Sequence, residues 1–260
     1  MSSEYSLNGT DLDQPGKWRV MEGTLLPAVS SPRLESTDVP FRSGIIDGAG
    51  LKVGTFKVTV AFMVEGADRA DLDRNFQALM ARLRASNKLA TLQHHPAGVS
   101  PREALVRLVS VSQPSWRDGG WGIDTTVVFE AVEGVWRDTT TIETQLDDLS
   151  RLAGGAAPIS DVVLKLKPTA NTVTIKDVTS GTSLTWRGTM ESDQRLLIDV
   201  GKYSAWRQVS ERWYPINGAF NASAEISMSP EGLQLTPNHE GKIVLQVTGT
   251  TGVIQARRAY

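Results

Sequence analysis

The fold of this 260-residue chain is decided by one segment, Phe56-Lys57-Val58-Thr59-Val60-Ala61-Phe62-Met63-Val64. Large apolar side chains occupy every second position of the segment, which is the period of a β-strand that buries one face. These side chains are Phe56, Val58, Val60, Phe62 and Val64. The segment therefore predicts a half-buried strand.

A single helix is predicted directly after this strand, from about residue 68 to residue 86. Apolar residues recur there at three- and four-residue spacing and form one stripe: Leu72, Phe76, Leu79, Met80 and Leu83. Aspartates near the start and arginines near the end suit the helix dipole. Further strands are predicted over residues 90–93, 104–112 and 124–132, so the first part of the chain is expected to be an α+β domain.

The chain is expected to divide into two domains. Residues 137–150 are polar and rich in Thr, and the Ala-, Gly- and Pro-containing segment 151–158 has the composition of a linker. We therefore assign residues 1–150 to the first domain and 159–260 to the second. In the second domain seven short strands are predicted, a pattern typical of an antiparallel β-sandwich. They cover residues 161–167, 172–178, 183–187, 195–200, 224–228, 242–248 and 253–258. The fold class is thus mainly β.

Composition excludes several classes of protein. The chain has no cysteine, which rules out disulfides, thiolate metal sites and cysteine nucleophiles. Its 27 basic and 29 acidic residues give a net charge of −2, which argues against binding nucleic acid by charge alone. The polar start lacks the apolar core of a signal peptide, and no run reaches the ~18 apolar residues of a membrane span. No membrane anchor is expected.

Catalytic motifs are missing from the sequence. The adjacent His94 and His95 would point to opposite sides of an extended chain, so we expect a strand-end or surface pair rather than a metal site. The glycine-rich segment Gly44–Gly50 lacks the Gly-Lys-Ser/Thr of a phosphate-binding loop. The carboxylate pairs Asp147–Asp148 and Glu191/Asp193 are too common by chance to indicate a glycosidase. We expect no enzyme activity, no catalytic or metal-binding residue and no cofactor.

The seven tryptophans allow two interpretations. Aromatic rings on a sandwich can stack on sugars, or they can anchor cores and subunit contacts. The sequence shows no accompanying cluster of Asn, His and Arg, so the second interpretation is favoured, and a carbohydrate-binding β-sandwich protein stays an alternative. The tryptophans considered are Trp116, Trp121, Trp136, Trp186, Trp206 and Trp213.

Several short segments carry a family resemblance by their order along the chain. They are Tyr5–Leu12 with its Leu-Asn-Gly, Asp71–Leu79, Ala104–Leu108, Val127–Ala131, Asn171–Ile175, Trp186–Gly188, Leu196–Asp199 and Gln255–Tyr260. In this order they resemble the distal tail proteins of long-tailed, non-contractile bacteriophages (siphoviruses), of the type found in phages of actinobacteria. The chain departs from that family at Leu235–Asn238, where Leu-x-Pro-Gly-x-Asn is common.

The resemblance implies a fold and a function. The first domain would be a split barrel like that of tail-tube proteins, and the second a galectin-like β-sandwich. The protein would be made in the host bacterial cytoplasm and would form a hexameric ring at the distal end of the tail in the virion. This ring would join the tail tube to the tip or baseplate, and DNA would pass through its channel without specific binding. Expected partners are further copies of the chain in a homohexamer, the tail-tube protein, and hub and other minor tail proteins. The tape-measure protein is a further candidate.

The subunit contacts of such a ring are predicted in the first domain. The aperiodic segment 27–54, interpreted as an extended loop or hairpin arm, lies beside the strongly apolar strand 56–64, and a ring can pair strand edges between neighbours. The candidate oligomer-interface residues are Ile45, Ile46, Phe56, Val58, Val60 and Phe62. A tail-tube subunit or another tip protein stays open as an alternative to the ring protein.

Overall fold

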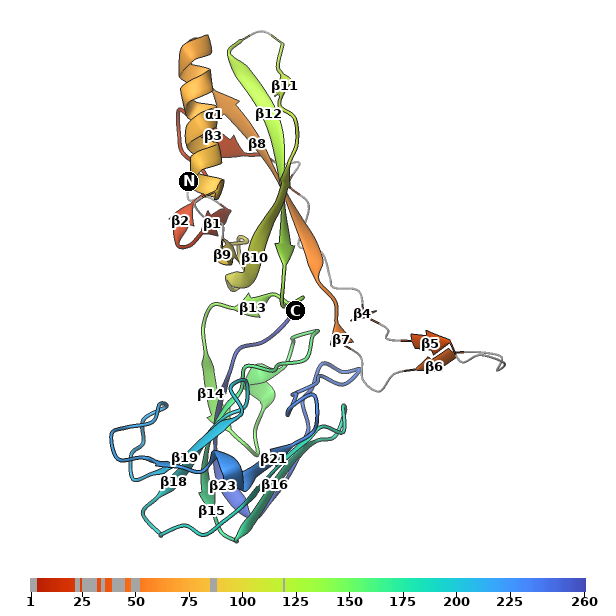
Figure 1. The fold of residues 1–260 in the computed structure, drawn as a ribbon, viewed down its shortest axis with the longest axis vertical. Helices are drawn as coiled ribbons and strands as arrows, with labels where there is room; N and C mark the ends of the chain where they lie inside the picture. The colour runs from red at the N-terminus through yellow and green to blue at the C-terminus, as the bar shows by residue number, and fades with distance from the viewer. Residues whose placement is uncertain are drawn as a thin grey trace. The chain divides into compact units, whose positions relative to one another are not determined.

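The computed structural model describes residues 4–21, 24, 32–33, 36–38, 45–47, 52–84, 88–118 and 120–260; the side chains of residues 32–53 lie outside this description. The chain forms two compact units, Met1–Arg137 and Asp138–Tyr260, here called unit 1 and unit 2. Each unit is built on antiparallel sheets (Figure 1). The α-helix in unit 1 is the only one among the described residues. The prediction of a mainly β fold with a single helix is confirmed.

Unit 1 contains one large antiparallel sheet with the strand order β2-β1-β9-β10-β12-β8-β3, and β11 pairs with β12. The elements up to the boundary are β1 (Tyr5–Leu7), β2 (Thr10–Asp11), β3 (Trp18–Val20), β4 (Pro32–Arg33), β5 (Ser36–Asp38), β6 (Ile45–Asp47), β7 (Lys52–Val53), β8 (Phe56–Glu65), α1 (Arg69–Arg84), β9 (Ala90–His94), β10 (Arg102–Val111), β11 (Ser115–Trp116), β12 (Gly122–Ala131) and β13 (Arg137–Asp138). Short ladders join β4 to β7 and β5 to β6. The rest of the predicted arm 27–54 lies largely outside the described residues.

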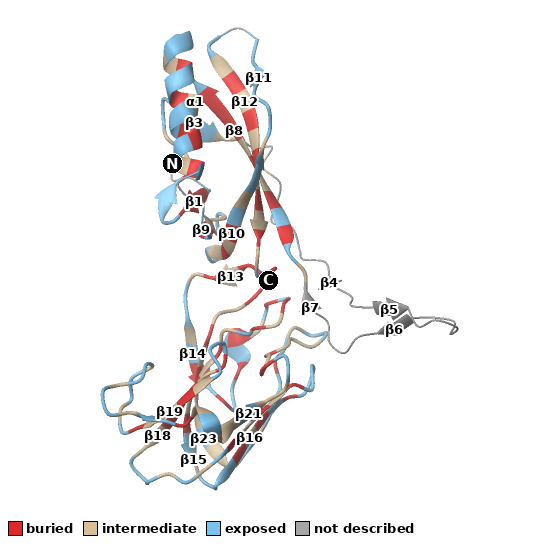
Figure 2. Ribbon diagram, viewed as in Figure 1, coloured by how far each residue is buried: buried red, intermediate tan, exposed pale blue. Residues whose placement is uncertain are grey.

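The core of unit 1 lies on one face of this sheet. Strands β8 and β12 pair along their whole length, from Phe56↔Ala131 to Glu65↔Gly122. Burial alternates along β12 and along β8 up to Phe62, after which Met63 and Val64 are both buried (Figure 2). Helix α1 contacts β8 and buries four of the five residues of its predicted stripe, whereas Phe76 is half-buried and Asn75 is buried instead. Between β8 and α1 only glycine fits, because a Cβ at Gly66 would lie 2.3 Å from the backbone nitrogen of Leu72. The strand and helix predicted from residues 56–86 are therefore both confirmed.

Unit 2 is a sandwich of two antiparallel sheets, ordered β14-β23-β15-β18-β19-β20 and β21-β17-β16-β22. Its elements are β14 (Ile142–Gln145), the 3₁₀ turn η1 (Ser150–Leu152), β15 (Val163–Pro168), β16 (Thr172–Asp177), β17 (Ser183–Arg187), β18 (Arg195–Asp199), β19 (Ser204–Gln208), β20 (Phe220–Asn221), the 3₁₀ turn η2 (Ser223–Glu225), β21 (Ile226–Met228), β22 (Leu245–Thr248) and β23 (Thr250–Ala256). Both sheets contribute fully buried side chains to the core, among them Leu164, Ile254, Ile175 and Trp186.

Unit 2 begins earlier than the predicted second domain does. Strand β14 pairs with β23, so residues 142–145 belong to the sandwich rather than to the end of the first domain. The predicted linker 151–158 is also part of unit 2, since Leu152 is fully buried and Ala157 forms a bridge with Ala259. The sequence does not reveal strand β14, because an edge strand needs few apolar side chains and this segment is polar and rich in Thr.

Candidate interaction surfaces

The four predicted interface residues of β8 lie in the core of unit 1. Phe56 is 6% exposed, Val58 2%, and Val60 and Phe62 are fully buried. Their own unit encloses these side chains, which leaves them no surface to offer a neighbouring subunit. Strong alternation marks a strand that packs against its own domain, so it was a poor signal for an oligomer contact. For Ile45 and Ile46 the contact stays a prediction, because the side chains of β6 lie outside the described part.

The opposite face of the sheet is where unit 1 meets solvent; we call it the open face, formed by Thr59 and Ala61 of β8 and Asp124, Thr126 and Val128 of β12. Its side chains alternate with the buried ones and are half-buried. They are small or carry hydroxyl groups, apart from the aspartate. The open face therefore presents mostly small side chains, and three of its residues, Ala61, Asp124 and Thr126, line a hollow.

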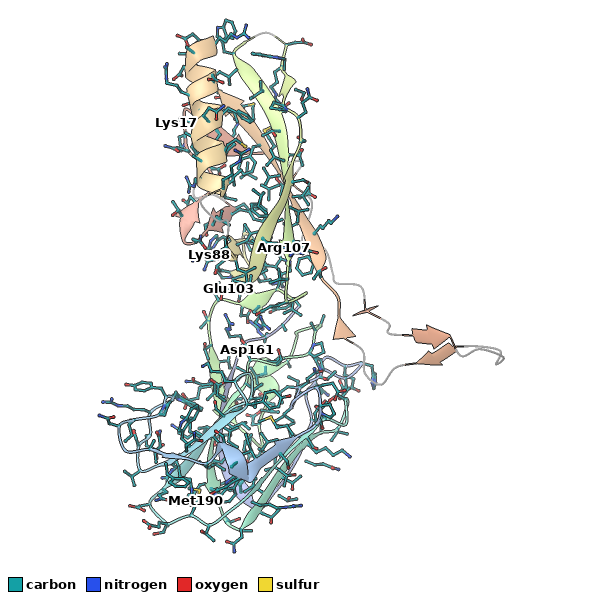
Figure 3. The ribbon with its side chains drawn as sticks, in the orientation of Figure 1. Lys17, Lys88, Glu103, Arg107, Asp161 and Met190 are labelled. Carbon is teal, nitrogen blue, oxygen red and sulfur yellow. The ribbon has the colours of Figure 1, made fainter. Side chains whose placement is uncertain are left out.

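Charges around the open face occur in pairs. Arg107, labelled in Figure 3, lies 2.5 Å from a carboxylate oxygen of Glu130, and Arg117 lies 2.9 Å from Asp124. Hydrogen bonds from Arg107 and then Thr55 lower the pKa of Glu130 below its usual range. Each pair cancels its own charge, while the exposed Lys57, opposite Glu130 in the ladder, adds a positive charge to the same face.

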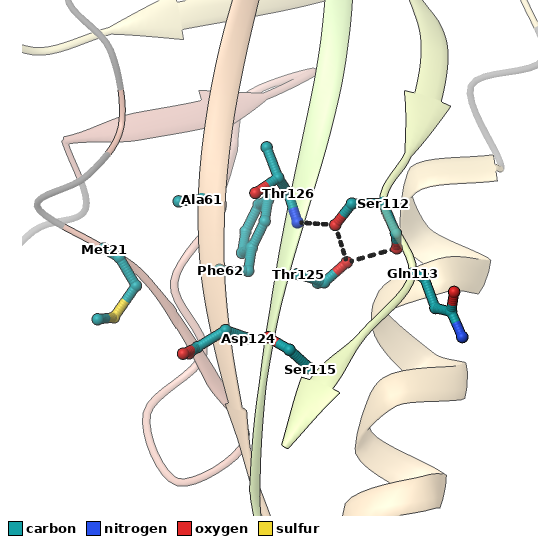
Figure 4. A pocket seen from close by; sticks show the side chains of 9 residues that line it. All are labelled: Met21, Ala61, Phe62, Ser112, Gln113, Ser115, Asp124, Thr125 and Thr126. Atoms are coloured by element: carbon teal, nitrogen blue, oxygen red, sulfur yellow. Dashed lines mark hydrogen bonds between the residues drawn. The ribbon is translucent and has the colours of Figure 1, made fainter. Parts of the chain in front are cut away.

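A hollow of about 260 Å³ lies beside these residues, drawn close up in Figure 4. The backbone nitrogen of Thr126 donates to the Ser112 hydroxyl at 2.8 Å, and the Thr125 hydroxyl donates to the Ser112 carbonyl at 3.2 Å. The carboxylate that lines the hollow, Asp124, is paired with Arg117, and the described lining residues include no histidine or lysine. The hydroxyl groups serve to hold the chain after β10 against β12.

Two tryptophans of unit 1 lie at the surface. Trp116 is 60% exposed and Trp121 46%, and their rings meet edge to face with centroids 6.5 Å apart. Trp116 also lines a hollow of about 200 Å³ together with Leu72 and Phe76 of α1. Exposed, mutually supported aromatic rings are typical of contact surfaces between proteins. This exposed pair is the strongest aromatic surface feature of unit 1.

The two histidines end strand β9 as expected, but His94 is buried. Its ring stacks on Tyr5 with centroids 4.6 Å apart, and its Nε2 lies 3.0 Å from a carboxylate oxygen of Glu4. Burial, followed by the charge of Glu4, raises the pKa of Tyr5 to about 12. His95 instead contacts the Ser6 hydroxyl at 3.2 Å. Both rings therefore hold β1 in the sheet, and of the two expected placements, strand end or surface, His94 has the first.

In unit 2 the loop 209–219 crosses one face of the six-stranded sheet. The carboxylate of Glu211 pairs with Lys165 of β15 at 3.2 Å and with Arg195 of β18 at 2.9 Å. The indole nitrogen of Trp213 donates to Glu143 of β14 at 3.0 Å, and the ammonium of Lys165 lies 4.5 Å from its ring centroid. Loop contacts to three different strands thus fix the loop on the sheet.

Gln208 organises the same loop from within. This side chain is 4% exposed, and its Nε2 lies 3.1 Å from the carbonyl of Arg212 and 3.4 Å from that of Tyr214. Its Oε1 accepts a hydrogen bond from the backbone nitrogen of Ile216 at 3.2 Å. The buried side-chain amide of Gln208 therefore supplies hydrogen bonds to loop backbone groups that would otherwise come from a neighbouring strand.

The tryptophans of the sandwich are engaged within it. Trp186 is fully buried and donates to Glu225 at 2.8 Å, while Trp206 is half-buried in β19 and Trp213 lies under Lys165. These contacts favour the interpretation of these residues as anchors of the fold. They disfavour a sugar platform built on Trp186 or Trp213.

The other candidate residues have structural partners or lie at the surface. Arg257 pairs with Asp161 at 2.8 Å and Arg258 with the buried Asp138 at 2.6 Å, which holds the pKa of Arg258 above its usual value. The carboxylates Asp147, Asp148, Glu191 and Asp193 are exposed. Most of Gly44–Gly50 lies outside the described residues. In the part that the structure describes, no cluster of His, Asp or Glu suits a metal ion, and no helix is long and apolar enough to span a membrane.

Comparison with solved structures identifies a shared fold. No protein-family description matches the chain, and no curated protein matches it either. The SPP1 Dit (gp 19.1) protein, described as a paradigm of the hub adsorption apparatus in phages that infect Gram-positive bacteria, is similar with a TM-score of 0.62 and 13% identity. The match covers 99% of this chain and 98% of that one. At this identity the comparison shows the fold alone.

Two further structures of phage P2 baseplates are similar at lower scores. The baseplate in its activated conformation with Ca matches with a TM-score of 0.42 and 10% identity, over 99% of this chain and 98% of that one. The form with Sr matches with a TM-score of 0.40 and 10% identity, over 98% and 97%. These scores are too low to bear on the fold.

Proposed function

We propose that this protein is a structural component of a phage tail, a hexameric ring at the distal end of the tail that joins the tube to the tip or baseplate. The observation that carries the proposal is the fold shared with the SPP1 Dit protein over nearly the whole of both chains. The order of the sequence segments supports placing it with the distal tail proteins of siphoviruses, of the actinobacteriophage type. In this proposal it is made in the bacterial cytoplasm and resides in the virion.

Unit 1 is the proposed ring-forming part, a split barrel of the tail-tube kind. Among the described strands its sheet is open, with β2 and β3 at the two ends of the strand order. Strand edges of this type are hazardous in a monomer, and a ring can pair or cover them between neighbouring subunits. The paired charges of the open face, such as Arg107–Glu130, suit a channel through which DNA passes without specific binding.

Unit 2 is the proposed contact to other tip proteins, with a galectin-like sandwich. Its partners in this proposal are hub and other minor tail proteins, while unit 1 meets the tail-tube protein and, as a further candidate, the tape-measure protein. The role requires no catalysis or cofactor. The mutual neutralisation of the charged groups described above suits an assembly protein rather than an enzyme.

The solution mass of the purified protein tests the ring directly. Light scattering combined with negative-stain images is expected to give the mass of six chains and ring-shaped particles. Filaments would instead favour a tube subunit, because an open helical contact does not close. A protein that stays monomeric at tens of micromolar, also after chemical cross-linking, contradicts the ring.

Deletion of residues 30–50 tests the proposed subunit contact, which includes Ile45 and Ile46. The expected product is a folded monomer, checked by light scattering and circular dichroism. The control is Val244→Ser, a change at an exposed position of unit 2 that is expected to leave the mass unchanged. A deletion variant that remains hexameric would contradict the proposed contact but would leave the proposal of a hexameric ring intact.

A further inference from the structure

One edge of the sandwich in unit 2 is open to an additional strand. Strand β22 ends the four-stranded sheet, and among the described strands its ladder partner is β16. The backbone nitrogen of Val178 donates to the carbonyl of Val244 at 3.0 Å, which sets the alternation of the ladder. Gln246 and Thr248 therefore direct their backbone groups to β16, while Leu245 and Val247 direct theirs to the open edge.

The same two residues face a hollow. It measures about 440 Å³, and its apolar wall consists of Leu146, Leu245 and Val247. Leu245 and Val247 are only half-buried, although they alternate with the exposed Gln246 and Thr248. The hollow thus lies on the core side of an edge strand, where the side chains of an added strand would point.

The β14 edge of the other sheet, by contrast, is covered by its own chain. The guanidinium of Arg151 donates to the carbonyl of Glu143 in β14 at 2.7 Å, and the hydroxyl of Thr144 donates to the carbonyl of Asp148. Strand β22 reads Leu-Gln-Val-Thr and carries no lysine or proline, the residues with which natural edges are protected.

We propose that β22 accepts a β-strand from a partner protein: an extended segment with apolar side chains at alternate positions and one Lys or Arg. The apolar side chains fill the hollow beside Leu245 and Val247, and the backbone of the segment pairs with the outward groups of these residues. The exposed carboxylate of Asp147, which lines the hollow, selects the basic residue. The inference concerns unit 2 by itself and holds whether or not the chain forms a ring.

The probe is a panel of heptapeptides with Val, Ile, Leu or Phe at alternate positions and one Lys at each of the remaining positions in turn. Binding is measured by the hydrogen exchange of individual amides in the full-length protein. The amides of Leu245 and Val247 are expected to slow at least about tenfold with a bound peptide, because they gain hydrogen bonds. Those of Gln246 and Thr248, already paired with β16, are expected to change less.

Two kinds of variant separate this proposal from non-specific binding. Peptides N-methylated on the residues that face β22 are expected to lose binding, whereas methylation of the outward residues leaves it. Asp147→Lys is expected to weaken binding about three- to tenfold, while the matched surface control Asp193→Lys has no effect.

Three results of the peptide experiment overturn the proposal. They are equal binding of both methylated peptides, protection at other amides, or no binding by any peptide at about millimolar concentration. Self-pairing of two copies through β22 would also overturn it. That outcome would appear as a dimer that Val247→Pro converts to monomers, since proline removes an outward N–H. The peptide experiment measures binding to unit 2 whether the protein is a monomer or a hexamer. A negative result would therefore contradict the strand-binding proposal without contradicting the proposed ring.

Discussion

Two loops of this molecule carry tryptophan and use it in opposite ways. In the loop 209–219 of unit 2, Trp213 donates to Glu143 and lies under the ammonium of Lys165. In the connection 112–121 of unit 1, Trp116 and Trp121 contact each other but remain 60% and 46% exposed. The loop 209–219 packs its tryptophan against its own sheet, whereas the connection 112–121 leaves both of its tryptophan rings exposed to solvent.

The difference separates what stabilises the fold from what is available to partners. A ring that already has a hydrogen-bond acceptor and a cation gains little from a second protein, and its loss costs stability. An exposed pair of rings contributes little to folding but offers large apolar area to an interface. Surface aromatics of this protein should therefore be judged by their internal contacts before a binding role is assigned.

The largest expected change in stability tests the comparison of the two loops directly. Trp213→Ala removes the ring between Lys165 and Glu143 and is expected to lower the free energy of unfolding by about 3 kcal/mol. Trp116→Ala removes an exposed ring and is expected to change it by less than about 0.5 kcal/mol. Urea denaturation followed by circular dichroism measures both. Equal losses in the two variants would refute the distinction between the loops.

The sequence predicts the fold best where one face is buried. Residues 56–64 alternate strictly, and the helix stripe ends where α1 ends, so both were found. The sequence does not predict strand β19, because Arg207 breaks the apolar pattern. The guanidinium of Arg207 pairs with Glu225 at 2.8 Å, a partner that no local pattern reveals. For the same reason the sequence does not separate the buried tryptophans from the exposed ones. Whether a ring is buried or exposed depends on distant residues, as Glu143 is for Trp213.

A second, smaller effect concerns the residue that shapes the loop of unit 2. Gln208→Ala leaves the carbonyls of Arg212 and Tyr214 and the amide of Ile216 without the buried partner they now have. The expected loss is roughly 2 kcal/mol, seen as a lower urea midpoint at an unchanged slope. In the control Gln246→Ala, on an exposed side chain, the midpoint is expected to stay. A normal midpoint for Gln208→Ala would show that the loop holds itself by its surface ion pairs alone.

The smallest expected effect is a dependence on pH at those ion pairs. The hydrogen bond from Lys165, with Arg195 nearby, lowers the pKa of Glu211 below its usual range. A carboxylate whose pKa is lower in the folded protein than in the unfolded chain adds stability above its unfolded pKa, and this stability is lost as the pH falls through the folded one. Because Glu211 is largely exposed, solvent screening keeps the effect small.

Glu211→Gln is therefore expected to unfold at lower urea than the wild type at pH 7, and the two midpoints should converge as the solution is acidified. The exposed Glu191→Gln serves as the matched control and should follow the wild type at every pH. A constant difference between Glu211→Gln and the wild type from neutral to acid would mean that Glu211 acts by packing rather than by charge.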